Sequence, residues 1–420
     1  MTKGSPLKLM LQFALPLLMG NLLQQTYNII DAAIVGQILG ADALASVGSS
    51  SSVQFLVLGF CIGCCAGFGV PVARYFGAGD HRTMRNYIFN GAVLTAIIAA
   101  ILMIACSLSC GQILHLLSVP DDIFGNAYVY LIVIFIGIPF TLLYNYLSSI
   151  LRSVGDSRTP FLFLGFSACL NIFLDLFCII VLKWGCMGAA IATITAQAIS
   201  GILCFFYIRG KMQLLRLEKE NMIVQKDAVK ELLGMGLPMG FQFSITAIGS
   251  MVMQAANNGL GSIYVSAFTA AMRIKQFLLC PFDAIGTAAS VFCSQNLGAR
   301  QADRIKKGAL EATIAGCIYG FSAGLILIFF GRPLSMIFLS KNAAVLDASA
   351  KYLRCLGFFF GILGILNVCR MVTQGLGYSG RAIFSGVMEM IGRVIVSVGF
   401  VGTMGYTAIC FADQAAWIAA

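Results

Sequence analysis

The sequence predicts an all-α integral membrane protein whose twelve transmembrane helices form two parallel six-helix repeats, with the twelfth helix cut short. Three observations lead to this class: long apolar segments, basic residues in alternate loops, and ordered matches between the two halves. Of the 420 residues, 59% are hydrophobic and 10% are charged, whereas a soluble domain carries roughly 25% charged residues. The apolar segments are continuous, so they predict helices and not the alternating strands of a membrane barrel.

The predicted helices follow the chain in order. They cover residues 7–35, 47–77, 84–110, 123–151, 160–182 and 187–208, then 231–258, 263–297, 305–330, 346–375, 382–401 and a segment that opens near Thr407. Residues 1–209 are therefore expected to form an amino-terminal lobe, and residues 231–420 a carboxy-terminal lobe with an incomplete last helix. The charge-rich residues 210–230 predict a cytoplasmic linker, whose interspersed leucines would allow an amphipathic surface helix.

Basic residues are concentrated in every second loop. The even-numbered loops and the linker carry most of them, including Arg82, Arg85, Arg304 and Lys307, and the odd-numbered loops are nearly bare. This positive-inside pattern predicts a multi-pass protein with a cytoplasmic amino terminus, and we expect it in a bacterial cytoplasmic membrane. The net charge of +10 therefore reflects topology, and no nucleic acid is expected as a partner.

The two sides of the linker resemble each other in order. Pro16 matches Pro238 at an offset of 222 residues, and Gly155 matches Gly377 at the same offset. Because six is an even number, both halves enter the membrane from the same side, as parallel repeats do in transporters that rock about a central site. Proline kinks a helix. Since the kink is duplicated it belongs to the architecture, and Pro16 is in addition a candidate hinge.

The match between the halves continues into the last segment. Gln197 matches Gln414 at an offset of 217, so Ala420 corresponds to Leu203, which lies before the end of the sixth helix. The twelfth helix is accordingly expected to be incomplete, either because the sequence is a fragment or because this helix is short.

Asp31 lies deep in the first apolar segment. An acid at membrane depth costs about 2.5–3.5 kcal/mol on insertion scales and indicates a functional site with a partner. The alternative is an acid that simply faces water inside the bundle. The repeat separates packing residues, which should recur in both halves, from residues that serve one site. The non-recurring polar residues are Asp31, Asn171, Asp175 and Thr193, which map onto Met253, Arg393, Ser397 and Cys410.

Asn171 and Asp175 are four residues apart on the fifth helix, and this spacing places them on one helix face. If the first and fifth helices face each other, Asp31 and Asp175 form a carboxylate pair. Two such acids cannot both stay ionised at low cost. The pair would then hold a proton or, with oxygens from Asn171 and Thr193, a hard cation such as Na⁺. Two unrelated acids, each satisfied separately, are the alternative.

Four further polar residues are weaker candidates. Gln24, Tyr27 and Asn145 would either extend the polar network into a substrate cavity or serve only as packed hydrogen-bonding groups. Asp283, on the eighth helix, is a candidate for the substrate cavity. In the second half, Glu389 and Arg393 are four residues apart, which favours a structural ion pair within one helix.

Ordered motifs run through the whole chain: Pro16, Gln24, Tyr27, Asp31-x4-Gly36, Gly40-Ala41-x2-Leu44-Ala45, Phe76-Gly77-Ala78-Gly79, Leu151-Arg152-x2-Gly155-Asp156-x3-Pro160, Asn171-x3-Asp175, Gln295-Asn296-Leu297-Gly298-Ala299 and Gln374-Gly375-x-Gly377. Together they resemble the multidrug and toxic compound extrusion (MATE) family. Each motif is loose alone, and their order makes the set specific.

The resemblance implies two six-helix lobes and the export of amphipathic, often cationic drug-like compounds in exchange for Na⁺ or H⁺. No cofactor is implied, and a monomer in the lipid bilayer is expected. The family's amino-terminal cation site falls here on Asp31, Asn171, Asp175 and Thr193. Some relatives instead use acids of the carboxy-terminal lobe, one of them on the seventh helix. No acid occurs here between Glu231 and Asp283, which argues against that second site.

Three rival functions remain. A flippase for lipid-linked oligosaccharides or polysaccharides would line its cavity with cationic residues, for which only Arg273, Lys275, Arg370 and Arg393 are candidates. An intramembrane enzyme needs a metal or nucleophile cluster, and the two histidines stand in separate loops. A channel would show a ring of pore-lining charge, which the repeat does not offer. We therefore expect a transporter and not an enzyme.

Overall fold

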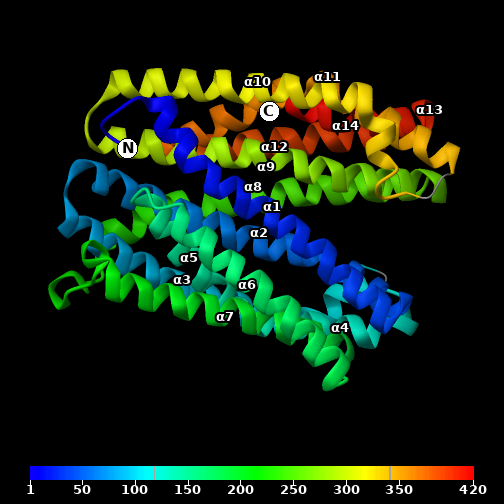
Figure 1. The fold of residues 1–420 in the computed structure, drawn as a ribbon, viewed down its shortest axis with the longest axis horizontal. Coiled ribbons are helices and arrows are strands. Elements are labelled where there is room, and N and C mark those ends of the chain that lie inside the picture. The colour runs from blue at the N-terminus through cyan, green and yellow to red at the C-terminus, as the bar shows by residue number, and fades with distance from the viewer. Residues whose placement is uncertain (118, 340–341) are drawn as a thin grey trace. The chain divides into compact units, whose positions relative to one another are not determined.

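The computed structural model describes residues 1–117, 119–339 and 342–420, and these residues are helical almost throughout (Figure 1). The helices of the first half are α1 (Pro6–Leu39), α2 (Ala41–Ala78), α3 (His81–Leu116), α4 (Asp121–Ile136), α5 (Ile138–Ser153), α6 (Arg158–Leu176) and α7 (Gly185–Lys211). Those of the second half are α8 (Lys226–Asn258), α9 (Ser262–Gly298), α10 (Ala302–Ser335), α11 (Ala343–Gly375), α12 (Ser379–Val394), α13 (Val401–Met404) and α14 (Tyr406–Ala419).

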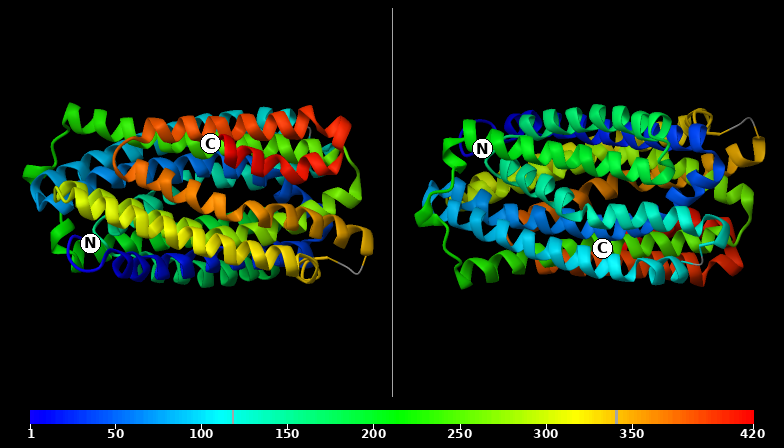
Figure 2. Two further views of the ribbon diagram at one scale, coloured as in Figure 1. Left: turned by 90° about the horizontal axis from the view of Figure 1, so that it is seen from above. Right: turned by 90° about the horizontal axis from the view of Figure 1, so that it is seen from below.

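The helices confirm the predicted all-α membrane class with its two repeats. Ten helices of the described chain are long and apolar enough to cross a bilayer. The pair α4 and α5, bent by 47° at Gly137, makes an eleventh crossing. The fourteen-residue α14 occupies the place of α7 in the second repeat and is shorter than a full crossing. The long helices of each half run alongside one another (Figure 2).

Local features recur at equivalent places in the two halves. A π-helical turn follows α6 at Phe177–Val181, and another follows α12 at Ile395–Gly399. The turn after α5 and the turn after α11 each use a glycine with φ of 93°, Gly155 and Gly377, a backbone conformation that favours glycine. One difference is clear: α4 and α5 are separate helices, whereas their counterpart α11 is continuous.

The chain forms two compact units. The amino-terminal unit is Met19–Gly240, and the carboxy-terminal unit is Met1–Leu18 together with Phe241–Ala420. Each boundary lies two residues after a proline inside a helix, Pro16 in α1 and Pro238 in α8. The first ends of α1 and α8 therefore each belong to the unit formed mainly by the other half. The lobe boundaries expected from the sequence, at residues 209 and 231, follow the linker and stay a prediction.

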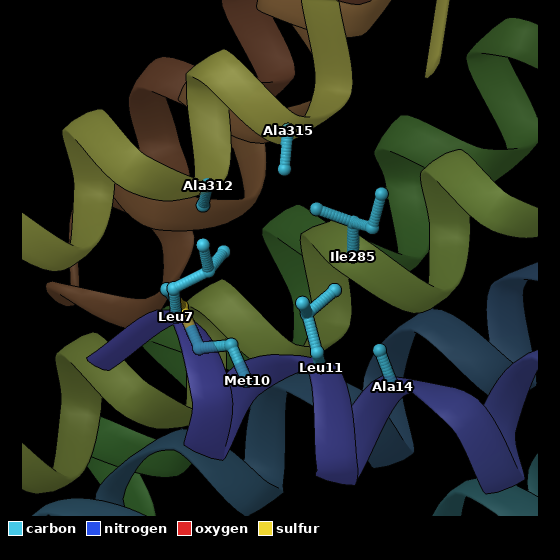
Figure 3. A pocket seen from close by; sticks show the side chains of 7 residues that line it. All are labelled: Leu7, Met10, Leu11, Ala14, Ile285, Ala312 and Ala315. Carbon is cyan, nitrogen blue, oxygen red and sulfur yellow. The ribbon is translucent and has the colours of Figure 1, made fainter. Parts of the chain in front are cut away.

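The first end of α1 is buried against α9 and α10 of the carboxy-terminal unit. Met10, Phe13 and Leu17 belong to one apolar core with Phe292 and Ala312. Beside this core is a small apolar pocket lined by Leu7, Met10, Leu11, Ala14, Ile285, Ala312 and Ala315 (Figure 3). Polar contacts hold the same end, because Glu311 accepts a hydrogen bond from the Leu7 N–H at 2.8 Å and so caps α1.

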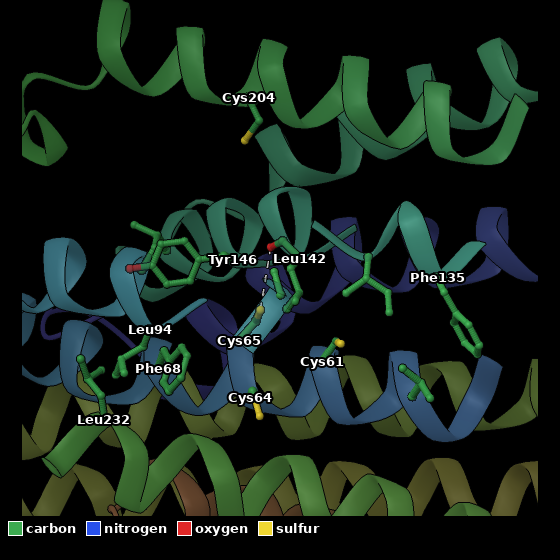
Figure 4. Packing of buried hydrophobic residues seen from close by; sticks show 14 of the residues in the cluster. Cys61, Cys64, Cys65, Phe68, Leu94, Phe135, Leu142, Tyr146, Cys204 and Leu232 are labelled. Atoms are coloured by element: carbon green, nitrogen blue, oxygen red, sulfur yellow. Dashed lines mark hydrogen bonds between the residues drawn. The ribbon is translucent and has the colours of Figure 1, made fainter. Parts of the chain in front are cut away.

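The first end of α8 packs on α2 through glycines. Gly63 and Gly67 of α2 face Gly236 and Gly240 of α8, and this small-residue spacing lets membrane helices approach closely. A methyl group at Gly63 would lie 2.6 Å from the Met239 carbonyl oxygen. The buried cysteines beside this contact point different ways: Cys65 points toward Leu142, and Cys64 points toward α8 (Figure 4).

The linker between α7 and α8 does not form the amphipathic helix that the leucine pattern would allow. It contains only two 3₁₀ turns, Gln213–Leu215 and Lys219–Asn221, in the green loops beside α7 (Figure 1). Side chains of α3 bind its carbonyl groups and so compete with helical hydrogen bonds. Arg85 donates to the Leu214 carbonyl at 3.1 Å, and Asn86 donates to the Ile223 carbonyl at 2.8 Å. The linker thus lies along the side of α3.

Candidate cation site and buried charges

The predicted carboxylate pair forms between α1 and α6. Leucine side chains bridge these helices, since a methyl group at Gly20 would lie 3.3 Å from the Leu164 side chain, and one at Gly165 would lie 3.5 Å from the Leu23 side chain. Further along the same contact, the carboxyl groups of Asp31 and Asp175 lie within hydrogen-bonding reach of each other. The two acids of the sequence analysis thus meet through their side chains, and the binding of a cation or proton by this pair stays a prediction.

Asn171 and Thr193 complete a group of oxygen atoms around Asp175. The Asn171 amide and the Thr193 hydroxyl are 3.3 Å apart. An amide orientation is assigned from its neighbours, and the orientation that satisfies Asn171 donates to Asp175 Oδ2 at 2.9 Å and accepts from the Thr193 N–H at 3.1 Å. In this orientation Asn171 holds the carboxylate of Asp175 against α7.

The two acids retain oxygens that no donor satisfies. Asp175 is fully buried, Asp31 is half-buried, and Oδ1 of each receives no hydrogen bond from the described residues. Buried polar atoms are rarely left unpaired, so these oxygens are suited to a ligand. Carboxylate, amide and hydroxyl oxygens are the ligands that a hard cation such as Na⁺ prefers, and a carboxylate can also take up a proton.

Two tyrosines border this cluster. The Tyr27 hydroxyl, one turn before Asp31 on α1, lies within hydrogen-bonding reach of Thr193. Tyr130 of α4 lies close to both Asp31 and Asp175, and its hydroxyl reaches Gln54 of α2. Sequence reasoning missed Tyr130. The available signal was a phenol inside an apolar helix, which usually requires a polar partner.

The structure does not bring the other predicted residues into this cluster. Gln24 is exposed on α1. Asn145 donates to the Thr141 carbonyl at 2.8 Å, within α5. Asp283 belongs to the other unit, where its exposed carboxylate accepts from Asn367 at 3.4 Å. Pro16 lies in α1 beside the boundary between the units.

A second, larger charge network is buried in the carboxy-terminal unit. The predicted ion pair is confirmed, with Arg393 Nη2 at 2.7 Å from Glu389 Oε1. Glu389 also binds Arg370 at 2.8 Å. Asp413, which sequence reasoning missed, binds Arg393 at 2.9 Å and Lys275 at 2.5 Å, and accepts from the Tyr352 hydroxyl at 2.6 Å. Both acids are thus neutralised by cations of three different helices.

Comparison with known proteins agrees with this architecture. A model of the MatE family matches residues 16–177 and 238–398. The probable multidrug resistance protein YpnP of Bacillus subtilis is 30% identical over 376 residues, which cover 90% of this chain and 84% of the relative. The FAD transporter of Shewanella oneidensis is 25% identical, covering 86% of this chain and 80% of the relative.

A solved structure shares the fold. A transporter of the MOP superfamily from Pyrococcus furiosus superposes with a TM-score of 0.92 at 21% identity, covering 99% of this chain and 94% of that one. With the family model matched over both halves and a relative at 30% identity, the chain is a multi-pass membrane protein that belongs to the multidrug and toxic compound extrusion (MATE) family of transporters.

Proposed function

We propose that this protein is a secondary antiporter that exports amphipathic, often cationic organic compounds in exchange for Na⁺ or H⁺. One observation carries the exchange: the carboxyl groups of Asp31 and Asp175 lie within hydrogen-bonding reach of each other, and each keeps an oxygen that receives no hydrogen bond from the described residues. The family, and the multidrug resistance activity for which the Bacillus subtilis relative is named, support drug-like substrates. We further propose a cytoplasmic amino terminus and a functional monomer.

In the proposed mechanism, ion binding changes the charge between α1 and α6. Without a bound cation or proton, the two carboxylates repel each other and favour a separation of the helices. Binding of Na⁺ or H⁺ between Asp31 and Asp175 removes this repulsion and draws α1 toward α6. Pro16 offers a place for α1 to bend, because proline cannot donate a backbone hydrogen bond.

Drug and ion must be coupled through different affinities for the two states, since a ligand shifts an equilibrium only in this way. We propose that Gln24, Tyr27, Asn145 and Asp283 contact the substrate. Tyr27 is the direct connection, because it is one turn from Asp31 and reaches Thr193. Ion binding would then move a residue that touches the drug.

The test is transport in proteoliposomes with Na⁺ and pH gradients imposed separately. Asp31→Asn and Asp175→Asn are each expected to reduce gradient-driven drug transport to background, with the amount of folded protein unchanged. The exposed Asp121→Asn, at the start of α4, is the matched control and should transport normally. Normal transport by both site variants would refute the site. The gradient that drives the native protein identifies the coupling ion.

A flippase for lipid-linked oligosaccharides or polysaccharides is less well supported. Three of its four candidate cations, Lys275, Arg370 and Arg393, are bound to Glu389 or Asp413. Arg273, on α9, is exposed. Bound cations are poorly available for an anionic headgroup. Fluorescent lipid-linked sugar in the same proteoliposomes would distinguish the two functions.

A further inference from the structure

We propose that the linker inserts its apolar tip, Met222–Val224, into the boundary between headgroups and acyl chains of the adjacent leaflet, and that Lys219 and Lys226 bind anionic phospholipid there. The drug-export function neither requires nor predicts this contact. It follows from the position of the linker against α3 in the amino-terminal unit.

The tip exposes three consecutive apolar side chains. Met222 is 45% exposed, Ile223 is 56% exposed and Val224 is 60% exposed. Earlier in the same linker, Leu215 is buried and Leu214 packs against the core of the amino-terminal unit. The linker thus separates its apolar residues into an inner set and an outer set. A contiguous exposed apolar patch marks a surface that meets a partner or a membrane.

Hydrogen bonds to α3 fix the backbone of the tip. The Ile223 carbonyl accepts from Asn86 at 2.8 Å and from Asn90 at 3.1 Å. The Gln225 N–H donates to Asn90 Oδ1 at 3.1 Å. These bonds use the buried faces of both asparagines. These bonds therefore set the direction of the tip. Its backbone cannot rotate to turn the side chains inward without breaking them.

The asparagines place the tip on the side of α3 that faces lipid. They lie in one row with four exposed apolar residues of this helix, at helical spacings of three, four and seven. The row continues through Ile97 (49% exposed), Ile101 (60%), Ile104 (55%) and Leu108 (81%). In a transmembrane helix such a row contacts acyl chains. The tip thus covers the polar end of a lipid-facing row.

The depth of the tip is that of a bilayer interface. From Asn90 to Ile97 the helix rises about 10 Å. The 36 residues of α3 extend roughly 54 Å, whereas the hydrocarbon core is about 30 Å thick. Part of α3 therefore projects beyond the core, and the polar end, which begins with Arg82 and Arg85, suits water and headgroups. Residues bound at Asn86 and Asn90 lie where the hydrocarbon begins.

Charge favours an anionic leaflet as the partner. Lys219 and Lys226 are exposed on either side of the tip. The linker and its flanks carry Arg209, Lys211, Arg216, Lys219, Lys226 and Lys230 against Glu218, Glu220 and Asp227. Glu218 is in addition paired with Arg85 at 2.8 Å. Apolar residues framed by lysines are the pattern of an interfacial segment that binds anionic lipid.

Tryptophan fluorescence in vesicles tests the insertion. Ile223→Trp is reconstituted in phosphatidylglycerol vesicles with acyl chains brominated near the headgroup, and the parent spectrum is subtracted because of Trp184 and Trp417. We expect a blue-shifted emission that the bromines quench. Glu220→Trp, an exposed position in the same linker, should emit as in water. Val224→Trp repeats the test, in case Ile223→Trp fails to fold. Water-like, unquenched emission from the folded tip variants would overturn the proposal.

The role of the lysines is tested in the same system. With Ile223→Trp present, bromine quenching should be stronger in phosphatidylglycerol than in phosphatidylcholine. Lys219→Gln with Lys226→Gln should remove that difference. Quenching that is equal in both lipids before the lysines are changed would refute anionic lipid as the partner. A difference that survives their replacement would refute the two lysines as its binding residues. Neither readout depends on transport, so its failure would leave the antiport proposal untouched.

Discussion

Asp413 is the residue on which the buried charges of the carboxy-terminal unit converge. Its carboxylate is fully buried and binds Lys275, Arg393 and Tyr352 at once. The Asp413 carboxylate is charged in all three bonds, and two of the donors are cations, Lys275 from α9 and Arg393 from α12. A buried ion pair adds little net stability when complete, but removing one partner leaves an unpaired buried charge.

Asp413→Asn is therefore predicted to destabilise the protein by about 3–5 kcal/mol. Its matched control is Asp347→Asn, because Asp347 pairs with Arg332 at 3.3 Å on the surface. A surface pair is worth about 0–1 kcal/mol. Thermal unfolding of both purified variants in detergent measures the difference. Equal unfolding midpoints for the two variants would contradict the structural role assigned to Asp413.

At this scale, sequence reasoning found residues that break the repeat and missed residues that do not stand out from it. Asp31 and Asp175 were found because membrane depth makes an acid conspicuous and because the second half lacks both. Tyr130 was missed since a tyrosine is ordinary in an apolar helix. Asp413 was missed since its partner Lys275 is 138 residues away in the sequence. Contacts between distant helices leave no local pattern.

At the scale of helices, glycines decide which surfaces come together. On α2, Gly67 lies against α8, and a methyl group there would lie 2.7 Å from the Met235 carbonyl oxygen. A backbone carbonyl cannot move aside as a flexible side chain can. The repeat predicted the helices and their order. It did not predict that the first turns of α8 pack on α2, because nothing in two short glycine motifs far apart in the sequence indicates that they contact each other.

Gly67→Ala is predicted to cost about 1–3 kcal/mol through overpacking. Gly48→Ala on the same helix is the control, since a methyl group at Gly48 meets open space. That change should be neutral or slightly stabilising, because alanine favours helix more than glycine. Thermal unfolding again gives the comparison. A Gly67→Ala protein as stable as the Gly48→Ala protein would show that α2 and α8 are not closely packed.

At the scale of the whole molecule, motion is expected where a helix passes from one compact unit into the other. In α1 this passage follows Pro16, and in α8 it follows Pro238. Proline weakens a helix at that point because one backbone hydrogen bond is missing. Pro71, in contrast, lies inside α2 and within a single unit. The chain therefore has one proline beside a boundary between the units, Pro16, and another inside a single unit, Pro71.

Pro16→Ala is predicted to restore the missing bond, to stiffen α1 and to slow drug transport without lowering thermal stability. Pro71→Ala should leave the transport rate close to that of the native protein. Initial rates in proteoliposomes, at equal amounts of folded protein, measure both effects. A Pro16→Ala protein that transports at the native rate would exclude the hinge.

The exchange of helix ends also bears on how this protein can be divided. A polypeptide that stopped in the linker would carry Met10, Phe13 and Leu17 without the α9 and α10 surface that buries them. Its counterpart would carry the glycines of α8 without α2. We therefore expect neither half-protein to fold on its own. Made together in one cell, each would supply the piece that the other lacks, so complementation should succeed where either fragment alone aggregates.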